Sequence, residues 1–270
     1  MKIGFVGAGN MAEGIIKGLI VSGTVKPADI IVSDIRKDRL TKLKKIYGVR
    51  LAVSNEELVN SSEVVILAIK PKDIDSVSMA LKNLKPDSMI LSILAGISTS
   101  HIEKLAAGGI KGKKVPVIRV MPNMPAMMLA GVSGISKGKY AKKGHYKKAE
   151  VIFKAVGEVT KVAEQLMDAV TAISGSGPAY LFLFAEAFLE AAIKIGMDAK
   201  TAKILVYNTL SGGAKLMSAS KDTPAMLRQK VTSPNGTTAA ALAVFESRDF
   251  KKIVLHAVEA AKKRSEEMTK

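Results

Sequence analysis

The sequence contains no cysteine and no tryptophan. Without cysteine the chain cannot form disulfide bonds, zinc sites with thiolate ligands or a cysteine nucleophile. Aromatic residues make up only 4% of its 270 residues, so few side chains can stack on the bases of a single-stranded nucleic acid. These absences exclude disulfide-stapled folds and thiol enzymes, and they disfavour a single-strand-binding module.

Long apolar runs are also missing. No run reaches the roughly 18 uninterrupted apolar residues that suggest a membrane span. The first residues, MKIGFVGAGNMAEG, contain glycines and an acid where a signal peptide has a clean apolar stretch. The composition, 48% hydrophobic and 24% charged, is typical of a globular protein. We therefore expect a soluble cytoplasmic protein with no membrane partner.

The formal net charge of +17 raises the question of nucleic-acid binding. The excess is mostly lysine and is scattered, with its densest cluster in KGKYAKKGHYKK at 137–148. No zinc-finger, RRM or KH motif accompanies it. We expect a linker and the start of a surface helix at this cluster, a solvated basic surface that attracts small anions, and no nucleic-acid partner.

The first 160 or so residues alternate short apolar runs with helical patterns such as residues 10–23 and 37–48. Continuous apolar strands separated by helices indicate a parallel sheet covered on both faces. We predict an α/β domain over residues 1–162, built as a doubly wound parallel sheet. Its expected strands are residues 2–6, 30–34, 64–70, 89–94, 115–121, 132–136 and 158–162.

From residue 163 onward the strand pattern disappears and long helical patterns replace it. These helices are apolar on more than one face, so another surface has to bury them. We predict an all-helical domain over residues 163–270 whose core is completed by a second subunit, with a compact monomeric bundle as the alternative. The expected helices cover residues 178–196, 199–220, 223–231 and 249–268.

A glycine motif, GAGNMA, directly follows the first expected strand and opens a helix. In this G-x-G-x-x-A pattern the first glycine makes the tight turn and the second lets a pyrophosphate approach the backbone. The small final residue allows close packing of helix on strand. The context predicts a dinucleotide site that includes Gly7, Ala8, Gly9, Asn10 and Met11.

The second strand ends in SDIRK, which carries two opposing signals. Asp34 stands where an acid holds the ribose hydroxyls of NAD and repels an added 2′-phosphate. Ser33, Arg36 and Lys37 could instead hold that phosphate. The sequence leaves the choice between NADH and NADPH open.

Two further strand ends lie at the same expected edge of the sheet, where ligands of doubly wound folds bind. The first, LAIKP, contains Ala68, Lys70 and Pro71. The second, VMPNMP, frames Asn123 with two prolines, which predicts a rigid wall near the nicotinamide.

The segment VTSPNGTTAAAL at 231–242 places turn residues and two hydroxyls before a run of helix formers. This pattern describes a helix start. The first N–H groups of a helix lack intrahelical partners and carry partial positive charge, so they can hold an anion. An ordinary N-cap is the alternative.

The segments FVGAGNMAEGIIKGL, LAIKP, VMPNMP, ISGSGPAY and VTSPNGTTAAAL occur in this order along essentially the whole chain. Together they resemble the pyrroline-5-carboxylate reductase family. The resemblance implies a Rossmann domain followed by a helical domain that intertwines with its dimer partner, in homodimers that commonly assemble five at a time into decamers. It implies reduction of 1-pyrroline-5-carboxylate to L-proline, the last step of proline biosynthesis, with NADPH slightly favoured over NADH.

The same resemblance implies roles for individual residues. Ser233 and Thr237, with the N–H groups around Gly236, would bind the substrate carboxylate, and Thr238 would hydrogen-bond the ring nitrogen. Asn55, Ala68 and Lys70 match cofactor-contacting positions, and Asn123 matches the loop between nicotinamide and substrate. Two residues depart from the common family pattern: Asn235 stands in place of a glycine, and Met124 in place of a threonine. Asparagine tolerates a positive φ better than most residues, so we expect the turn to survive.

The expected chemistry requires no strong acid, because an iminium carbon is already electrophilic. The three histidines, His101, His145 and His256, lie outside the motifs, and we interpret them as incidental. No cluster of Asp, Glu and His has the spacing of metal ligands, so we expect no metal.

Two alternatives stay open. A β-hydroxyacid dehydrogenase on the same scaffold would need a catalytic lysine on the helix that begins near Pro178, but the lysine of that helix, Lys194, is at its far end. A nucleotide-sensing or nucleic-acid-binding protein that lost turnover would leave the intact SPNGTT loop unexplained.

Overall fold

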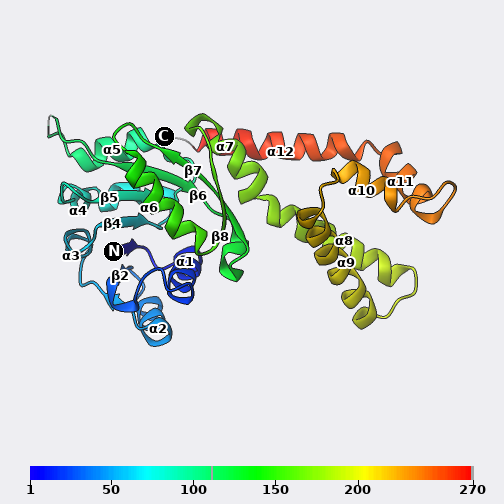
Figure 1. The fold of residues 1–270 in the computed structure, drawn as a ribbon, viewed down its shortest axis with the longest axis horizontal. Helices are drawn as coiled ribbons and strands as arrows, with labels where there is room; N and C mark the ends of the chain where they lie inside the picture. The colour runs from blue at the N-terminus through cyan, green and yellow to red at the C-terminus, as the bar shows by residue number, and fades with distance from the viewer. Residues whose placement is uncertain (111, 269–270) are drawn as a thin grey trace. The chain divides into compact units, whose positions relative to one another are not determined.

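The computed structural model describes residues 1–110 and 112–268. Two compact units make up the chain, the first formed by Met1–Ser176 with the described residues from Ala261 onward, the second by Gly177–Ala260. In Figure 1 the first unit runs from blue to green, with the end of α12 in red, and the second from yellow-green to orange.

Within the described residues the first unit contains an eight-stranded sheet in the order β3-β2-β1-β4-β5-β6-β7-β8 (Figure 1). Neighbouring strands pair in parallel except for β6 and β7, which are antiparallel. The doubly wound α/β fold predicted from the sequence is thus confirmed. The strands are β1 (Ile3–Val6), β2 (Ile30–Ser33), β3 (Arg50–Leu51), β4 (Val64–Leu67), β5 (Met89–Ser92), β6 (Val117–Met121), β7 (Gly131–Lys137) and β8 (Gly157–Lys161).

The antiparallel strand β7 departs from an all-parallel sheet. Its connection from β6 is residues 122–130, which include a 3-10 turn at Met124–Met128. A parallel return needs a crossover of about a dozen residues or more, so this short connection sends the chain back in the opposite direction. The next strand, β8, is parallel to β7 because helix α6 (Lys143–Lys154) supplies a crossover between them.

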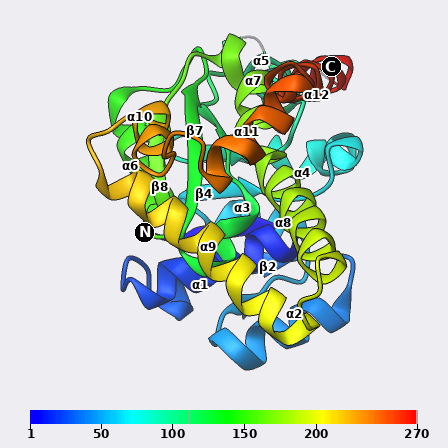
Figure 2. The same ribbon diagram turned by 90° about the vertical axis from the view of Figure 1, so that its right-hand side faces the viewer.

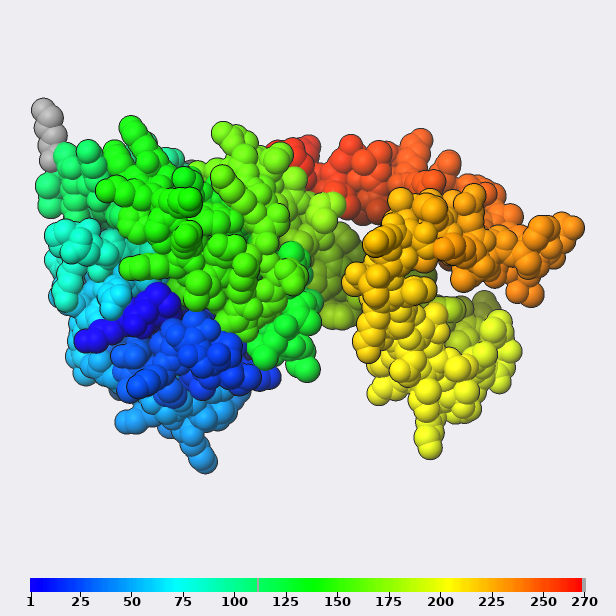
Figure 3. Space-filling model, viewed as in Figure 1, coloured from blue at the N-terminus to red at the C-terminus, as the bar shows by residue number. Residues whose placement is uncertain are grey.

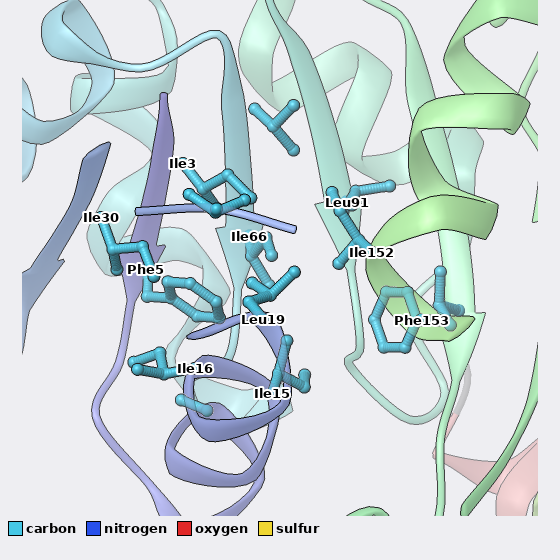
Figure 4. Packing of buried hydrophobic residues seen from close by; sticks show 14 of the residues in the cluster. Ile3, Phe5, Ile15, Ile16, Leu19, Ile30, Ile66, Leu91, Ile152 and Phe153 are labelled. Carbon is cyan, nitrogen blue, oxygen red and sulfur yellow. The ribbon is translucent and has the colours of Figure 1, made fainter. Parts of the chain in front are cut away.

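Helices cover both faces of the sheet, and each face has its own apolar core. On one face, side chains of α1 (Asn10–Val21), α2 (Lys37–Tyr47) and α6 pack against alternate residues of the strands. Figure 4 shows this packing for α1 and α6. On the other face, α3 (Asn55–Ser61), α4 (Ser78–Leu81) and α5 (Thr99–Ala107) do the same. Successive strand residues point to opposite faces, so Phe5 belongs to the first core and Val6 to the second.

Beyond β8 the chain continues onto the sheet through a short helix, α7 (Met167–Val170), and a π-helical turn at Thr171–Gly175. Arg119 on β6 is 4% exposed and lies 3.9 Å from Oε1 of Glu164 and 3.8 Å from Oδ1 of Asp168. Ser265 near the end of α12 (Phe250–Glu267) donates to the same Asp168 oxygen at 2.7 Å. These contacts explain why the compact units divide after Ser176, whereas the predicted domain boundary lies between residues 162 and 163.

The second unit is helical throughout its described residues, as predicted. It contains α8 (Gly177–Lys194), α9 (Ala199–Ala219), α10 (Pro224–Lys230), α11 (Thr237–Ser247) and most of α12, with α8 and α9 packed together (Figure 2). Its buried apolar side chains are few: Ala192, Ala202 and Val206. Large apolar side chains of α8 are exposed instead, namely Leu181, Phe182, Leu183, Phe184, Phe188 and Ile193.

One helical stretch among the described residues, Glu164–Lys194, is long and apolar enough to cross a membrane by length and composition. Only 6% of its most apolar window is buried, and its mean hydropathy is 1.3. An apolar helix surface of this kind is equally suited to an interface between subunits, whose cores are depleted of charge.

Candidate dinucleotide and substrate sites

The glycine motif lies at the carboxyl edge of the sheet, where β1 passes into α1. Gly7 has a φ of +105°, and a Cβ atom there would lie 2.6 Å from the carbonyl oxygen of Ala68. Its N–H donates to the carbonyl of Ser33 at 2.8 Å, so the turn joins the ends of β1, β2 and β4. A Cβ atom on Gly9 would meet no atom within 4 Å. The backbone at Gly9 is thus open to a ligand, as the motif predicts.

Helix α1 begins directly behind this opening. Gly9 is its N-cap and supplies no side-chain hydrogen bond, so no side chain of the cap occupies the first N–H groups. An uncapped start of a 12-residue helix suits an anion. Asn10 is exposed and Met11 half-buried at this start.

The carboxylate of Asp34 accepts hydrogen bonds from the glycine loop and from Arg36. Its Oδ2 accepts the N–H of Ala8 at 2.7 Å, and its Oδ1 accepts the N–H of Arg36 at 2.8 Å and Nε of Arg36 at 3.3 Å. Burial by itself raises the pKa of this carboxyl, but the hydrogen bonds from Ala8 and Arg36 outweigh it and lower the pKa overall. Asp34 is therefore an ionised acceptor that fixes the loop.

The other residues predicted around the end of β2 divide into two groups. Ser33 is 6% exposed and donates its hydroxyl to Oδ1 of Asn55, the first residue of α3, at 2.6 Å. Arg36 is exposed over 53% of its side chain, and Lys37 is exposed at the start of α2. The structure thus presents two cations to solvent next to a carboxylate that already accepts protein N–H groups.

Arg39 and Glu13 are residues of this region that the sequence interpretation missed. Arg39 Nε donates to the carbonyl of Ala8 at 3.0 Å, and its Nη2 lies 2.7 Å from Oε2 of Glu13. Charged residues on amphipathic helices usually face solvent, and only the position of each in the first turn of its helix could have drawn attention to them.

The remaining cofactor candidates lie at neighbouring strand ends. Ala68 donates its N–H to the carbonyl of Val6 at 2.8 Å, and Lys70 is exposed just before a 3-10 turn that Pro71 begins. Asn123 is 8% exposed, and its Oδ1 accepts the N–H of Val132 at 3.0 Å, which ties the loop after β6 to β7. Met124 is 56% exposed in that loop.

In the second unit, the predicted substrate loop forms a tight turn before α11, in the orange segment on the surface in Figure 3. Asn235 has a φ of +57°, which confirms that asparagine takes the left-handed conformation expected here. Gly236 donates its N–H to the carbonyl of Ser233 at 3.1 Å and is the N-cap of α11, with no side-chain cap. Thr237 and Thr238 begin the helix, the first exposed and the second half-buried.

None of the three histidines forms a hydrogen bond or ion pair with a carboxylate among the described residues. His145 Nδ1 accepts the N–H of Lys142 at 3.0 Å, and burial with the nearby Lys148 and Lys142 lowers its pKa. His101 Nε2 is buried without a hydrogen-bond partner, and His256 is exposed. Among the described residues no group of three His, Asp or Glu side chains could hold a metal ion.

Comparison with known proteins gives two family matches. Residues 164–268 match the pyrroline-5-carboxylate reductase dimerisation family, and residues 2–96 match the family described as NADP oxidoreductase, coenzyme F420-dependent. Pyrroline-5-carboxylate reductase 2 of Bacillus subtilis (strain 168) is 39% identical over 272 residues, which cover 99% of this chain and 95% of that protein.

Solved structures agree with the sequence matches. A pyrroline-5-carboxylate reductase from Coxiella burnetii gives a TM-score of 0.91 at 36% identity, covering 100% of this chain and 98% of the other. The pyrroline carboxylate reductase of Plasmodium falciparum, solved with NADP bound, gives 0.86 at 29% identity with coverage of 100% and 98%. The sequence motifs, the fold and these similarities together show that the chain belongs to the pyrroline-5-carboxylate reductase family, whose members are NAD(P)-dependent oxidoreductases.

Proposed function

We propose that this protein reduces 1-pyrroline-5-carboxylate to L-proline with NADPH or NADH, and that two glycine-capped helix starts hold the two reactants. The observation that carries the proposal is that both helix N-termini have the same kind of cap. Gly9 before α1 and Gly236 before α11 are both N-caps without a side-chain hydrogen bond. The reaction has two anionic groups to hold, the pyrophosphate of the cofactor and the carboxylate of the substrate, and backbone N–H groups at a helix start suit both.

The residues at the first start fit a nicotinamide dinucleotide. A side chain at Gly7 would strike the backbone of Ala68, while the space beside Gly9 is open. The loop from Gly7 to Met11 would hold the pyrophosphate, with Ser33, Asp34, Arg36 and Asn55 around the adenosine ribose. Ala68, Lys70, Pro71 and Asn123 would line the path toward the nicotinamide. When bound, the cofactor supplies the hydride.

The second start would hold the substrate carboxylate. The N–H of Gly236 is engaged by Ser233, so the N–H groups that follow it, at Thr237 and Thr238, are the donors in the first turn of α11. Ser233 and Thr237 are exposed residues, and their hydroxyls would add side-chain donors. Asn235 shapes the turn through its left-handed conformation.

The protein's part in the chemistry is positioning. The C=N carbon of the substrate gains the hydride and its nitrogen gains a proton, so that a carbon–nitrogen double bond becomes a single bond. The Thr238 hydroxyl orients the nitrogen and donates to it, or the proton arrives from solvent beforehand. Holding the reacting carbon in place and excluding water supply the rate enhancement.

We further propose that the chain has two domains with different functions. Residues 1–162 form the dinucleotide domain, and residues 163–270 form the substrate-binding and dimerisation domain. The exposed apolar face of α8 and the match of residues 164–268 to a dimerisation family support a homodimer through this domain. We propose that five such dimers assemble into a decamer. We also propose that the protein is cytoplasmic and has no nucleic-acid or membrane partner.

Product analysis tests the reaction. Purified protein is incubated with 1-pyrroline-5-carboxylate and nicotinamide cofactor that carries deuterium at the transferable position. The proposal predicts L-proline with one deuterium at the carbon that was doubly bonded to nitrogen. Proline without deuterium, or no proline from protein that binds the cofactor, would refute hydride transfer to the imine carbon.

A further inference from the structure

The peptide groups on either side of Ala8 are held by charged side chains of opposite sign. The N–H of Ala8 donates to Oδ2 of Asp34 at 2.7 Å, and its carbonyl accepts from Nε of Arg39 at 3.0 Å. Ala8 itself is fully buried. The acid comes from the end of β2 and the arginine from α2, so two elements outside the glycine motif hold its backbone.

Arg39 is in turn held by Glu13 on the first turn of α1. Its Nη2 lies 2.7 Å from Oε2 of Glu13, and the two side chains are 14% and 13% exposed. Burial favours a protonated Glu13, but hydrogen bonds and charges from Arg39 and Lys42 outweigh it and lower its pKa. Glu13 is thus kept ionised, and Arg39 is fixed in one orientation between α1 and α2.

We propose that Arg39 is a positioning residue that sets the glycine-rich loop for the cofactor's pyrophosphate. The inference rests on the proposed function and adds a residue to it. The direction of a backbone N–H is set by the orientation of its peptide plane, and the Ala8–Gly9 peptide, whose carbonyl Arg39 holds, carries the N–H of Gly9. Anchoring that carbonyl fixes the donor at the point where the backbone is open to a ligand.

A purely structural role would make a different prediction. The Arg39–Glu13 pair links α1 to α2, and such a link could stabilise the fold without any effect on the loop. Lys42 supplies the matched control, because its Nζ lies 3.3 Å from Oε1 of the same Glu13 and it is 49% exposed. It is bonded to the same acid, but no hydrogen bond joins it to Ala8.

The experiment measures the dissociation constants of NADPH and NADH from nicotinamide fluorescence, without substrate, together with the melting temperature. The variants are Arg39→Lys, Arg39→Met and Lys42→Met. Arg39→Lys keeps a cation beside Glu13 but loses the planar fork that reaches both Glu13 and Ala8. Both Arg39 variants lose the hydrogen bond from the charged guanidinium to the Ala8 carbonyl. Loss of such a bond corresponds to about a tenfold change in an equilibrium constant, so we expect both variants to bind both cofactors about tenfold more weakly. Lys42→Met should bind them as the unmodified protein does.

Equal weakening of NADPH and NADH identifies the pyrophosphate loop, since the two cofactors share that group. Arg39→Lys with unchanged dissociation constants would overturn the inference, as would the same loss in Lys42→Met. Weakening of NADPH alone would also overturn it, because Arg39 would then act on the 2′-phosphate. Unmodified protein that binds neither cofactor would overturn the proposed function and this inference together, whereas the preceding outcomes leave the proposed function intact.

Discussion

The hydroxyl of Ser233 fills the space that a Cβ atom on Gly236 would need. The same two residues are joined by the Gly236 N–H, which donates to the Ser233 carbonyl at 3.1 Å. We therefore expect Gly236→Ala to turn the Ser233 hydroxyl away from its place beside the start of α11. Displacement of about an ångström can cost about a hundredfold in rate, so kcat/KM for the imine should fall by about that factor.

Steady-state kinetics and cofactor titration check this expectation. The dissociation constant of the cofactor should be unchanged, because the role proposed for this loop is to hold the substrate. Gly144→Ala is the matched control, since a Cβ atom there meets nothing within 4 Å. A Gly236→Ala variant with normal kinetics would show that the turn does not hold the substrate.

Thr238 is assigned to the substrate nitrogen, so Thr238→Ala should act on turnover. Loss of a positioned proton donor costs about a hundredfold in kcat, whereas cofactor binding should be retained. The matched control is Thr232→Ala, whose hydroxyl already donates to the carbonyl of Arg228 at 2.7 Å. An unchanged kcat in Thr238→Ala would refute the assigned role.

We expect Arg36 to determine the preference for NADPH over NADH. Both oxygens of Asp34 accept protein N–H groups, and the Arg36 side chain beside it is 53% exposed. An arginine at this place accommodates a 2′-phosphate, and loss of such a charged contact is worth about tenfold in affinity. Arg36→Gln should therefore raise KM for NADPH about tenfold and leave KM for NADH close to its original value. Equal changes for both cofactors would contradict a 2′-phosphate contact.

The lowered pKa of Asp34 predicts a pH-dependent contribution to stability. Since the folded-state pKa lies below the usual 3.8, the ionised carboxylate stabilises the fold at pH above about 3.8. That contribution is lost as the pH falls through the lowered pKa. Denaturant unfolding of the unmodified protein and Asp34→Asn should show a free-energy gap at neutral pH that narrows below pH 3.8. A gap that stays constant down to that range would contradict the hydrogen bonds assigned to the ionised form.

The apolar face of α8 predicts the effect of a charge placed on it. Phe182 is 57% exposed within one chain, so a dimer through this helix would bury it. In a two-fold interface Phe182→Glu would bury an unpaired carboxylate from each copy, and we expect light scattering to report monomers. Val151→Glu, at a 51% exposed apolar position on α6, should leave the dimer intact. A Phe182→Glu dimer would place the interface elsewhere.

Much of the fold could be predicted from the sequence because its signals are local. The glycine motif, the continuous apolar strands and the helix ends, such as Gly48 in its left-handed conformation after α2, lie within a few residues of the structure they specify. The two-residue strand β3 was missed, because a pair as short as Arg50 and Leu51 has no periodicity of its own and pairs only because β2 is beside it.

The sequence predicted the substrate loop more completely than the residues that support the glycine loop. The substrate loop is a single segment, so the turn at Asn235 and the start of α11 follow from its own residues. The support of the glycine loop depends on Arg39, Glu13 and Asp34, which come from three elements. Nothing in the sequence shows that Asp34 and Arg39 hold the two peptide groups of Ala8, or that Glu13 holds Arg39, because these contacts depend on how α1 and α2 pack against the sheet.

The most direct test of the proposed reaction is absorbance at the nicotinamide band, with the purified protein, 1-pyrroline-5-carboxylate, and NADPH or NADH in separate cuvettes. We expect a loss of absorbance that requires the imine and is faster with NADPH. No loss with either cofactor, from folded protein that still binds one of them, would contradict the proposed function.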